Sequence, residues 1–209
     1  MGLMGAEATR APDTSPLLAP RSRPAPLESR IALHLALPGA GSSVCYEAVN
    51  TATVSLREAT REDVGLIRQL IFELAEYERD PAAALATEEG LLRDGFSETP
   101  VFRVVVAECD ARPAGFALYF FNYSTWQGRR GLYLEDLFVC PSFRGRGIGT
   151  ALIRHLARIA LDAGCGRLVW QVLDWNEPSI RFYESRGARV VEEWLTMRVD
   201  GEQLRRLAE

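Results

Sequence analysis

Apolar residues in the second half of the chain recur with the spacing of one long helix that follows a strand. Residues 132–139 are rich in apolar and aromatic side chains and predict a strand, and the Pro-containing run 140–143 ends it. Residues 148–163 repeat at helical steps of three and four, which predicts a helix with one buried face. The positions on that face are Ile148, Ala151, Leu152, His155, Leu156, Ile159, Ala160 and Ala163.

The same reading predicts further elements on both sides of this unit. Strands are expected at 54–58, 101–108, 114–121, 167–173 and 190–199, and helices at 60–80, 87–95, 176–187 and 201–208. Residues 109–113 are expected to turn between two strands, and residues 122–131 to form a polar loop. The order β-α-α-β-β-β-α-β-α-β predicts an α/β (α+β) domain, in which a mixed sheet carries helices on its faces.

Two of these helices carry capping signals. Thr60, with Asp63 three residues later, has the pattern of a capping box at the start of the first helix. Thr87 and the two glutamates after it begin the second helix. Gly95 is expected to close that helix as a left-handed cap.

Residues 1–53 differ in composition from the rest of the chain. They hold six of the eleven prolines and one aromatic residue, Tyr46, and they show no sustained apolar period. Such a segment buries too little apolar surface to offset the entropy of ordering it, so disorder is expected. A regulatory or targeting tail, or a translation start near Val54, are alternative interpretations. The folded domain is predicted to span residues 54–209.

Charge and composition disfavour several functional classes. The net charge of −4 argues against nucleic acid as the main partner, because non-specific binding needs a basic face. No run approaches the roughly 20 apolar residues of a membrane span. The four cysteines have no metal-binding spacing, and two histidines are few for a zinc site or a histidine-based triad. We therefore expect a cytoplasmic protein with reduced thiols and no metal.

The loop before the long helix has the features of an anion-binding site. A helix N-terminus presents backbone N–H groups that have no partner within the helix. Alternating glycines let a ligand approach this backbone, and Arg144 and Arg146 add positive charge, so a phosphate or pyrophosphate fits. A plain glycine-rich turn is the simpler alternative. A dinucleotide fingerprint is disfavoured, because the glycine spacing is G-x-G-x-G instead of G-x-G-x-x-G.

Three stretches together resemble the acetyl-CoA site of the GNAT superfamily of N-acetyltransferases. They are LEDLFV (134–139), RGRGIG (144–149) and WNEPSIRFY (175–183). Arg144, Gly147 and Gly149 match the family motif of Arg or Gln, two residues, Gly, one residue, and Gly or Ala. The resemblance covers residues 54–209. It implies a mixed, mostly antiparallel central sheet flanked by helices, with acetyl-CoA as co-substrate and no metal.

Within that superfamily, the chain is most similar to the diamine acetyltransferases, the spermidine/spermine and thialysine group. The stretches that carry this likeness are ELAEYE (73–78), DGF (94–96), YSTW (123–126) and YLED (133–136). Polyamine-acetylating members carry an aspartate where this chain has Ser124, whereas thialysine-type members carry the YSTW run. Loss of that carboxylate removes one counter-charge for a long polycation. The resemblance therefore implies a small diamine or lysine-like primary amine.

The resemblance also assigns contacts to acetyl-CoA. The loop and the first helical turn are expected to hold the pyrophosphate, and a backbone N–H near Phe138 or Val139 to stabilise the oxyanion. Asn176 is expected to cap its helix and to contact the pantetheine arm. The expected cofactor-binding residues are Phe138, Val139, Arg144, Gly145, Arg146, Gly147, Ile148, Gly149, Thr150, Asn176 and Tyr183.

Acetyl transfer to an amine also needs a proton acceptor and a proton donor. Tyr183 is expected to protonate the leaving thiolate, although a core tyrosine is the alternative interpretation. Glu135 is expected to draw off the ammonium proton through water. Strand alternation is expected to place Asp136 on the opposite face from Glu135, where it contacts the substrate or a dimer partner.

Tyr77, Glu78 and Trp126 are the expected substrate-side residues. A carboxylate between aromatic walls suits a primary ammonium through charge and cation–π contact. The alternative for Glu78 is an ordinary solvated acid at a helix end, because Glu73, Glu76 and Asp80 lie nearby in the sequence.

Two other functions stay open at this point. One is a GNAT enzyme that modifies a protein amine or an aminoglycoside, and the other is a non-catalytic acetyl-CoA sensor. Tyr183 and Glu135 disfavour the sensor, because binding alone requires neither. The resemblance further implies a homodimer, and residues 190–199, with Trp194 and Met197, are a candidate dimer surface or plain core.

Overall fold

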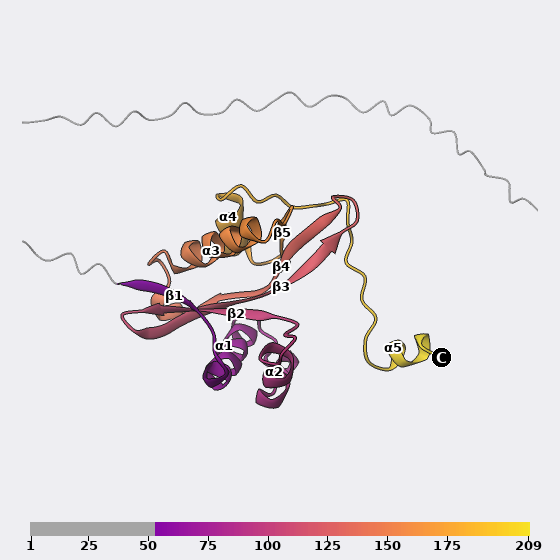
Figure 1. Cartoon of the computed structure of the whole chain (residues 1–209), viewed down its shortest axis with the longest axis horizontal. Helices are drawn as coiled ribbons and strands as arrows, with labels where there is room; N and C mark the ends of the chain where they lie inside the picture. The colour runs from indigo at the N-terminus through magenta and orange to yellow at the C-terminus, as the bar shows by residue number, and fades with distance from the viewer. Residues whose placement is uncertain (1–52) are drawn as a thin grey trace, which may run out of the picture. The chain divides into compact units, whose positions relative to one another are not determined.

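The computed structural model of the chain describes residues 53–209, and it contains a five-stranded sheet (Figure 1). The strands lie in sequence order across this sheet, and each neighbouring pair is antiparallel except β4 and β5, which are parallel. The predicted mixed, mostly antiparallel sheet is confirmed. The strands are β1 (Val54–Glu58), β2 (Arg103–Cys109), β3 (Arg112–Ser124), β4 (Arg129–Val139) and β5 (Leu168–Val169).

Helices cover both faces of the sheet. Figure 1 shows α1 and α2 against one face and α3 and α4 against the other. The α-helices are α1 (Val64–Tyr77), α2 (Glu88–Gly95), α3 (Ile148–Asp162), α4 (Glu177–Glu184) and α5 (Gly201–Leu207). Three short 3₁₀ turns precede α1, α2 and α3, and they are η1 (Arg61–Asp63), η2 (Pro81–Ala83) and η3 (Pro141–Phe143).

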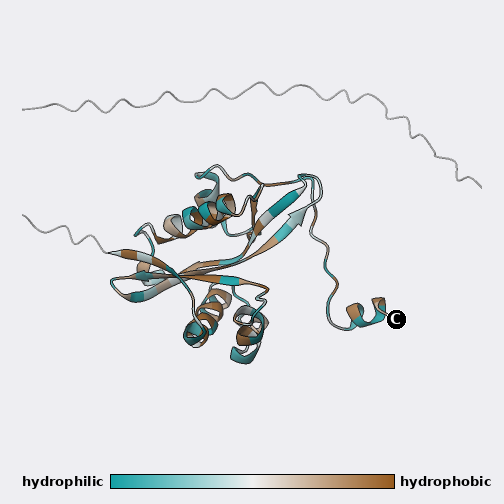
Figure 2. Cartoon of the chain, viewed as in Figure 1, coloured by the Kyte–Doolittle hydropathy of each residue, from teal (hydrophilic) through white to brown (hydrophobic). Residues whose placement is uncertain are grey.

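Each face of the sheet has its own hydrophobic cluster. Leu152 and Leu156 of α3 pack with Leu132 of β4 in one cluster, and Ile67 and Leu70 of α1 belong to the other. In Figure 2 hydrophobic and hydrophilic stretches alternate along the ribbons of α1 and α3. The helical period seen in the sequence is therefore the pattern of a helix with one face on a sheet, and burial of these side chains supplies the main driving force for folding.

The capping predictions hold at the helix starts and fail at one helix end. Thr60 and Asp63 form the predicted capping box, and the Thr87 hydroxyl accepts the backbone N–H of Gly90 at 3.1 Å. Gly95, however, is the last residue of α2 and is not left-handed, so the predicted cap is wrong. A Cβ at Gly95 would lie 2.5 Å from the Phe102 ring, which makes the absence of a side chain a packing requirement.

The predicted polar loop at 122–131 is also wrong, because β3 and β4 extend through most of it as a hairpin. Ser124 pairs with Arg129, and only residues 125–128 form the turn. The side chain of Ser124 is buried and accepts the backbone N–H of Gln127 at 3.2 Å. The sequence pattern missed these strand ends because their residues are mostly polar. An exposed two-stranded ribbon needs no apolar face.

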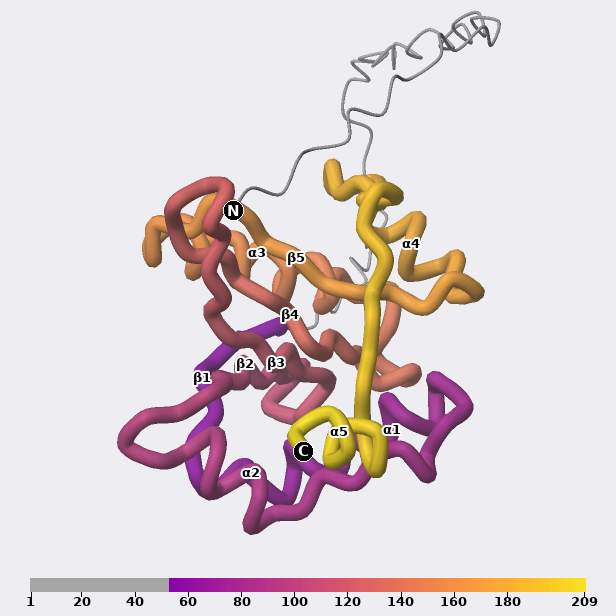
Figure 3. Tube along the Cα trace, turned by 90° about the vertical axis from the view of Figure 1, so that its right-hand side faces the viewer, coloured from indigo at the N-terminus to yellow at the C-terminus, as the bar shows by residue number. Residues whose placement is uncertain are grey.

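The predicted strands after α3 differ most from the structure. Residues 167–173 contribute only the two residues of β5, and residues 190–199 form no strand. Figure 3 shows this last segment running as an extended trace to α5, which is present as predicted. Apolar residues here fit a strand by pattern, yet Trp194 is 67% and Met197 89% exposed, so the segment is not core within one chain.

Candidate functional site

A cavity of about 500 Å³ opens where β4 and β5 separate. The two strands pair only at Leu132–Leu168 and Tyr133–Val169, and β4 continues to Val139 without β5 beside it. Because a strand without a neighbour keeps unpaired N–H and C=O groups, this edge of β4 can bind a ligand through its backbone. Residues 134–139 of β4 line the cavity together with parts of α1, the loop before α3, and α4.

Strand β4 carries a bulge at the cavity. Leu134 pairs with Tyr119 and Asp136 with Leu118, so Glu135 is an extra residue without a partner on β3. A bulge interrupts the alternation of faces. The prediction that Glu135 and Asp136 occupy opposite faces assumed strict alternation. Both residues line the same cavity, so they are not separated as predicted.

Three carboxylates therefore share one cavity. Glu78 lies just after α1, and Glu135 and Asp136 lie on β4. Burial, followed by the charges of Glu135 and Glu78, raises the pKa of Asp136 to about 6. Burial also raises the pKa of Glu78. The cavity thus concentrates negative charge that a cationic ligand would neutralise.

The glycine- and arginine-containing loop that the sequence predicts to bind a phosphate or pyrophosphate lies at the cavity. Gly147 is left-handed, with φ of 79°, and caps α3, so a side chain at this position would be strained. Five of the residues predicted to bind the cofactor line the cavity, and they are Gly145, Gly147, Ile148, Gly149 and Thr150.

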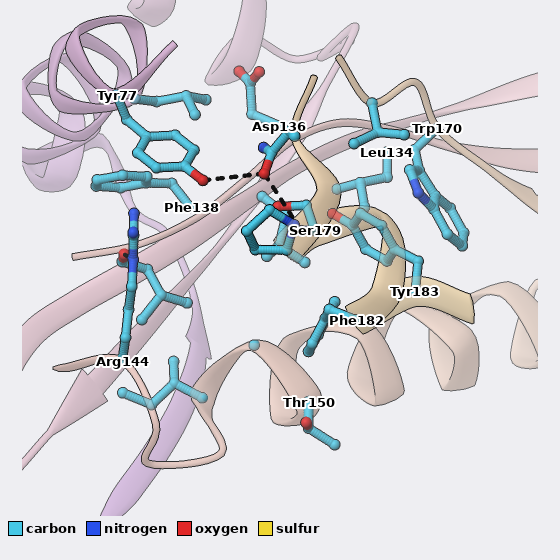
Figure 4. Close-up of a pocket in the computed structure, with 18 of the residues that line it drawn as sticks. Tyr77, Leu134, Asp136, Phe138, Arg144, Thr150, Trp170, Ser179, Phe182 and Tyr183 are labelled. Atoms are coloured by element: carbon cyan, nitrogen blue, oxygen red, sulfur yellow. Dashed lines mark hydrogen bonds between the residues drawn. The ribbon is translucent and has the colours of Figure 1, made fainter. Parts of the chain in front are cut away.

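The two predicted loop arginines point in different directions. Arg144 lines the cavity, where its Nε donates to the Val139 carbonyl at 3.0 Å and its guanidinium lies 4.5 Å from the centre of the Tyr77 ring (Figure 4). Arg146 instead donates to the Ser142 carbonyl at 3.4 Å and does not line the cavity. The structure therefore brings one of the two arginines to the site.

Sequence reasoning missed Arg186, which lies just after α4 and lines the cavity. Its Nη2 donates to the Thr150 hydroxyl at 2.5 Å, and its guanidinium lies 3.7 Å from the centre of the Phe182 ring. Arg186 is three residues after Tyr183, and residues three apart lie on the same side of a helix. This spacing was the available signal in the sequence.

Tyr183 projects from α4 into the cavity, as Figure 4 shows. Its ring packs against Trp170, with ring centres 4.7 Å apart, and against Phe182 at 5.1 Å. Burial, and then the charge of Glu78, raises the pKa of Tyr183 to about 12. The phenol is therefore protonated at neutral pH, and both the core and the catalytic interpretations agree with its packing.

Asn176 joins two sides of the cavity. Its Oδ1 accepts the backbone N–H of Ser179 at 3.3 Å, which is the predicted N-cap, and also the Tyr77 hydroxyl at 3.1 Å. In Figure 4 a dashed line marks the bond that the Tyr77 hydroxyl donates. The amide Nδ2 of Asn176 stays available for a ligand.

Trp126 and Ser124 lie outside the cavity in the single chain. They sit at the β3–β4 turn, and β4 rises about 17 Å between Arg129 and its first cavity-lining residue, Leu134. Trp126 is 87% exposed and contacts Trp194 edge to face, with ring centres 5.9 Å apart. The predicted aromatic wall from Trp126 is therefore not formed within one chain.

Within residues 53–209, no cluster of three or more His, Cys, Asp or Glu side chains is arranged to hold a metal ion. Across the same range, no helix is both long and apolar enough to cross a membrane. The cysteines at 109, 140 and 165 are free thiols, whereas Cys45 and the segment predicted to be disordered, apart from residue 53, lie outside the described residues.

Comparison with known proteins agrees with this geometry. Residues 66–188 match the acetyltransferase (GNAT) family. The chain is 44% identical to a thialysine N-epsilon-acetyltransferase from Bos taurus, over 75% of this chain and 98% of that protein. It is 30% identical to an L-ornithine N5-acetyltransferase from Arabidopsis thaliana, over 71% of this chain and 85% of that one. An integron cassette protein from the V. cholerae mobile metagenome has a similar structure, with a TM-score of 0.64, 31% identity, and coverage of 75% and 98%.

Proposed function

The chain belongs to the acetyltransferase (GNAT) family, and we propose that it moves the acetyl group of acetyl-CoA to the side-chain amine of a lysine-like amino acid. One observation carries the proposal. A single cavity holds a phosphate-type loop and, on its other side, the carboxylates Glu78, Glu135 and Asp136. Figure 4 shows Asp136 and Thr150 on opposite sides of this space. An anionic cofactor and a cationic amine fit these two sides.

The relatives support an amino-acid substrate, since the names of two of them specify thialysine and L-ornithine. Both molecules carry a primary amine on a short side chain. Ser124 lies outside the cavity of one chain and accepts the N–H of Gln127 in its turn, so it adds no counter-charge for a longer polyamine.

A panel of amines tests the choice of substrate. Release of free CoA is measured with thialysine, lysine, ornithine, putrescine, spermidine, spermine and an aminoglycoside. We expect the highest kcat/KM among the amino acids, because the relatives' names specify thialysine and L-ornithine. Higher kcat/KM for spermine or for the aminoglycoside would contradict the proposal. Binding of acetyl-CoA in calorimetry without CoA release from any amine would favour the non-catalytic sensor.

The proposed cofactor contacts combine backbone and side-chain groups. The N–H groups of residues 145–150 face the pyrophosphate, and Nδ2 of Asn176 meets the pantetheine arm. A backbone N–H near Phe138 or Val139 on the open edge of β4 is the proposed oxyanion donor. Arg186, instead of Arg146, is the proposed second cation beside Arg144, because its guanidinium contacts Thr150 in the first turn of α3.

Substitution of Arg186 tests this cofactor contact. Arg186→Gln should raise KM for acetyl-CoA about tenfold, equivalent to about 1.4 kcal/mol, through loss of one charge-assisted hydrogen bond. KM for the amine should change little. Arg181→Gln is the matched control, because Arg181 lies nearby on α4 but pairs with Glu177 at 2.6 Å and does not line the cavity. Equal KM values for acetyl-CoA in the two variants would remove Arg186 from the site.

Tyr183 is the proposed general acid. The amine attacks the thioester carbonyl, the C–S bond breaks, and the thiolate takes the phenol proton. A pKa of about 12 lies above the reference value of about 8.5 for a thiol, so a separate transfer to free thiolate would be uphill. The transfer therefore accompanies C–S cleavage, and the phenolate then recovers a proton from the newly formed, protonated amide nitrogen.

Tyr183→Phe removes only the hydroxyl and keeps the ring between Trp170 and Phe182. We expect kcat to fall about 100-fold while KM for acetyl-CoA stays within about twofold, because general-acid catalysis contributes on this scale. Steady-state CoA release measures both values. An unchanged kcat would return Tyr183 to a packing role.

We further propose a cytoplasmic homodimer, in which the partner copy covers the C-terminal segment 190–209. This segment exposes apolar side chains along its whole length, which is uncommon for a monomer surface. They are Val190, Val191, Trp194, Leu195, Met197, Val199, Leu204 and Leu207. Trp126 contacts this segment through Trp194, so the hairpin tip continues the same surface.

Light scattering tests the dimer. The full chain should have a mass near twice 23.2 kDa at micromolar concentration, and Trp194→Arg with Met197→Arg should halve it, because two charges cannot be buried against the partner. Leu161→Arg is the control, since Leu161 is 76% exposed on α3. A wild-type chain with the mass of one copy would rule out the dimer.

A further inference from the structure

We propose that Arg79 binds the α-carboxylate of the substrate at the rim of the cavity, and so selects lysine-like amino acids over plain diamines. This inference rests on the proposed function, because it concerns the same substrate and the same cavity. It follows from the backbone position of Arg79 and from its contact with Trp175. It also follows from the charge of the substrate, whose carboxylate must approach an acidic cavity.

Arg79 occupies a backbone position that favours glycine. It follows the C-cap of α1 and is left-handed, with φ of 67°. Its N–H donates to the Glu76 carbonyl at 3.1 Å, and the N–H of Asp80 donates to the Ala75 carbonyl at 3.0 Å. These two bonds form a Schellman motif, whose left-handed residue is commonly glycine because a side chain there is strained. A long cationic side chain kept at such a position points to a use for its guanidinium.

The guanidinium of Arg79 lies on the loop before α4, at the edge of the cavity. Its central carbon is 4.6 Å from the centre of the Trp175 ring, and Trp175 is 40% exposed. The next residue, Asn176, lines the cavity and accepts the Tyr77 hydroxyl at 3.1 Å. Arg79 therefore lies beside the point where the end of α1 meets the loop before α4.

The side chain of Arg79 is open to a ligand. It is exposed, and within residues 53–209 it forms no ion pair and donates no hydrogen bond to another residue. The two arginines that line the cavity are engaged elsewhere. Arg144 donates to the Val139 carbonyl at 3.0 Å. Arg186 donates to the Thr150 hydroxyl, on the side proposed for the cofactor. Arg79 is thus a free cation at the substrate side.

The substrate needs a cation at this place. A lysine-like amino acid carries an ammonium on its side chain and a carboxylate at its α-carbon, separated by a chain of methylene groups. When the ammonium lies among Glu78, Glu135 and Asp136, the carboxylate stays at the rim, where these acids repel it. A guanidinium offsets the repulsion and donates two parallel hydrogen bonds to a carboxylate. A diamine has no carboxylate and gains nothing from Arg79.

Lysine and lysinamide are a matched pair of substrates that tests the contact. Lysinamide keeps the side chain and the α-ammonium, and a neutral amide replaces its carboxylate. For Arg79→Gln we expect kcat/KM for lysine to fall about tenfold, mainly through a higher KM, because a charge-assisted interaction is lost. kcat/KM for lysinamide should stay within about twofold of wild type, because this substrate does not use the guanidinium. Steady-state release of CoA measures both values.

Arg68→Gln is the matched control for loss of a positive charge. Arg68 is exposed on α1, the helix that ends just before Arg79, and it does not line the cavity. This variant should leave kcat/KM unchanged for both substrates. A fall for lysine as large as that of Arg79→Gln would mean that overall charge, and not a contact at the rim, attracts the substrate.

Arg79→Gly separates the guanidinium from the backbone. Glycine adopts the left-handed conformation without strain, so this variant should unfold at a higher temperature than Arg79→Gln. It should nevertheless lose about tenfold in kcat/KM for lysine, because it lacks the same charge-assisted interaction. Arg79→Lys keeps the charge without the planar pair of donors, so it should recover part of the loss.

The outcomes separate this inference from the proposed function. A loss confined to lysine in both Arg79→Gln and Arg79→Gly supports the contact. If wild type acetylates lysine and either variant keeps its full kcat/KM, Arg79 does not bind the carboxylate, while the proposed function stands. If Arg79→Gln lowers kcat/KM equally for lysine and lysinamide, Arg79 acts on the shape of the cavity, and the inference is overturned. If wild type acetylates no lysine-like amine, both proposals fail together.

Discussion

The short pairing between β4 and β5 is the constraint on which the site depends. Two residue pairs join these strands, and beyond Tyr133 the edge of β4 has no strand beside it. Trp170, the first residue after β5, packs against Tyr183 of α4 and does not extend the ladder. As a result, backbone N–H and C=O groups along this edge of β4 have no partner on a neighbouring strand. Arg144 already satisfies one of them, the Val139 carbonyl, at 3.0 Å. A ligand that carries amide groups can satisfy others.

The same separation divides the cavity by charge. The loop and the first turn of α3 present N–H groups and Arg186 to an anion, while the bulge turns Asp136 toward the side occupied by Glu78. A flat, fully paired β4 would bury these groups against a neighbouring strand. In the proposed function, the thioester of the cofactor lies between the two sides, next to Tyr183. The cavity thus has one side suited to an anion and one suited to a cation, which the proposed direct transfer requires.

Much of this arrangement could be predicted from the sequence, and the reasons are local. The helical period of α3, the capping box of Thr60 and Asp63, and the loop at 144–149 each depend on a few neighbouring residues. The bulge at Glu135 was not predictable, because it arises from the register between β3 and β4. The direction of Arg146 and the arrival of Arg186 at Thr150 depend on contacts between segments far apart in sequence.

The errors at the C-terminus have a different origin. Residues 190–199 have the composition of a strand, but a strand needs a neighbour, and the short β5 offers none beyond Val169. Apolar pattern alone does not tell whether the covering surface belongs to the same chain or to a second copy. For the same reason, the sequence placed Trp126 at the substrate, whereas its contact in the structure is Trp194.

Hydrogen exchange of the β4 amides, with and without CoA, tests the central claim most directly. The open edge should accept the pantetheine arm, so amides within residues 134–139 should gain protection when CoA binds, together with those of the loop at 145–150. Amides of residues 129–133, which come before the open edge, should change little. Protection confined to the loop, with none in residues 134–139, would contradict the account, because the cofactor would then bind without using the gap between β4 and β5.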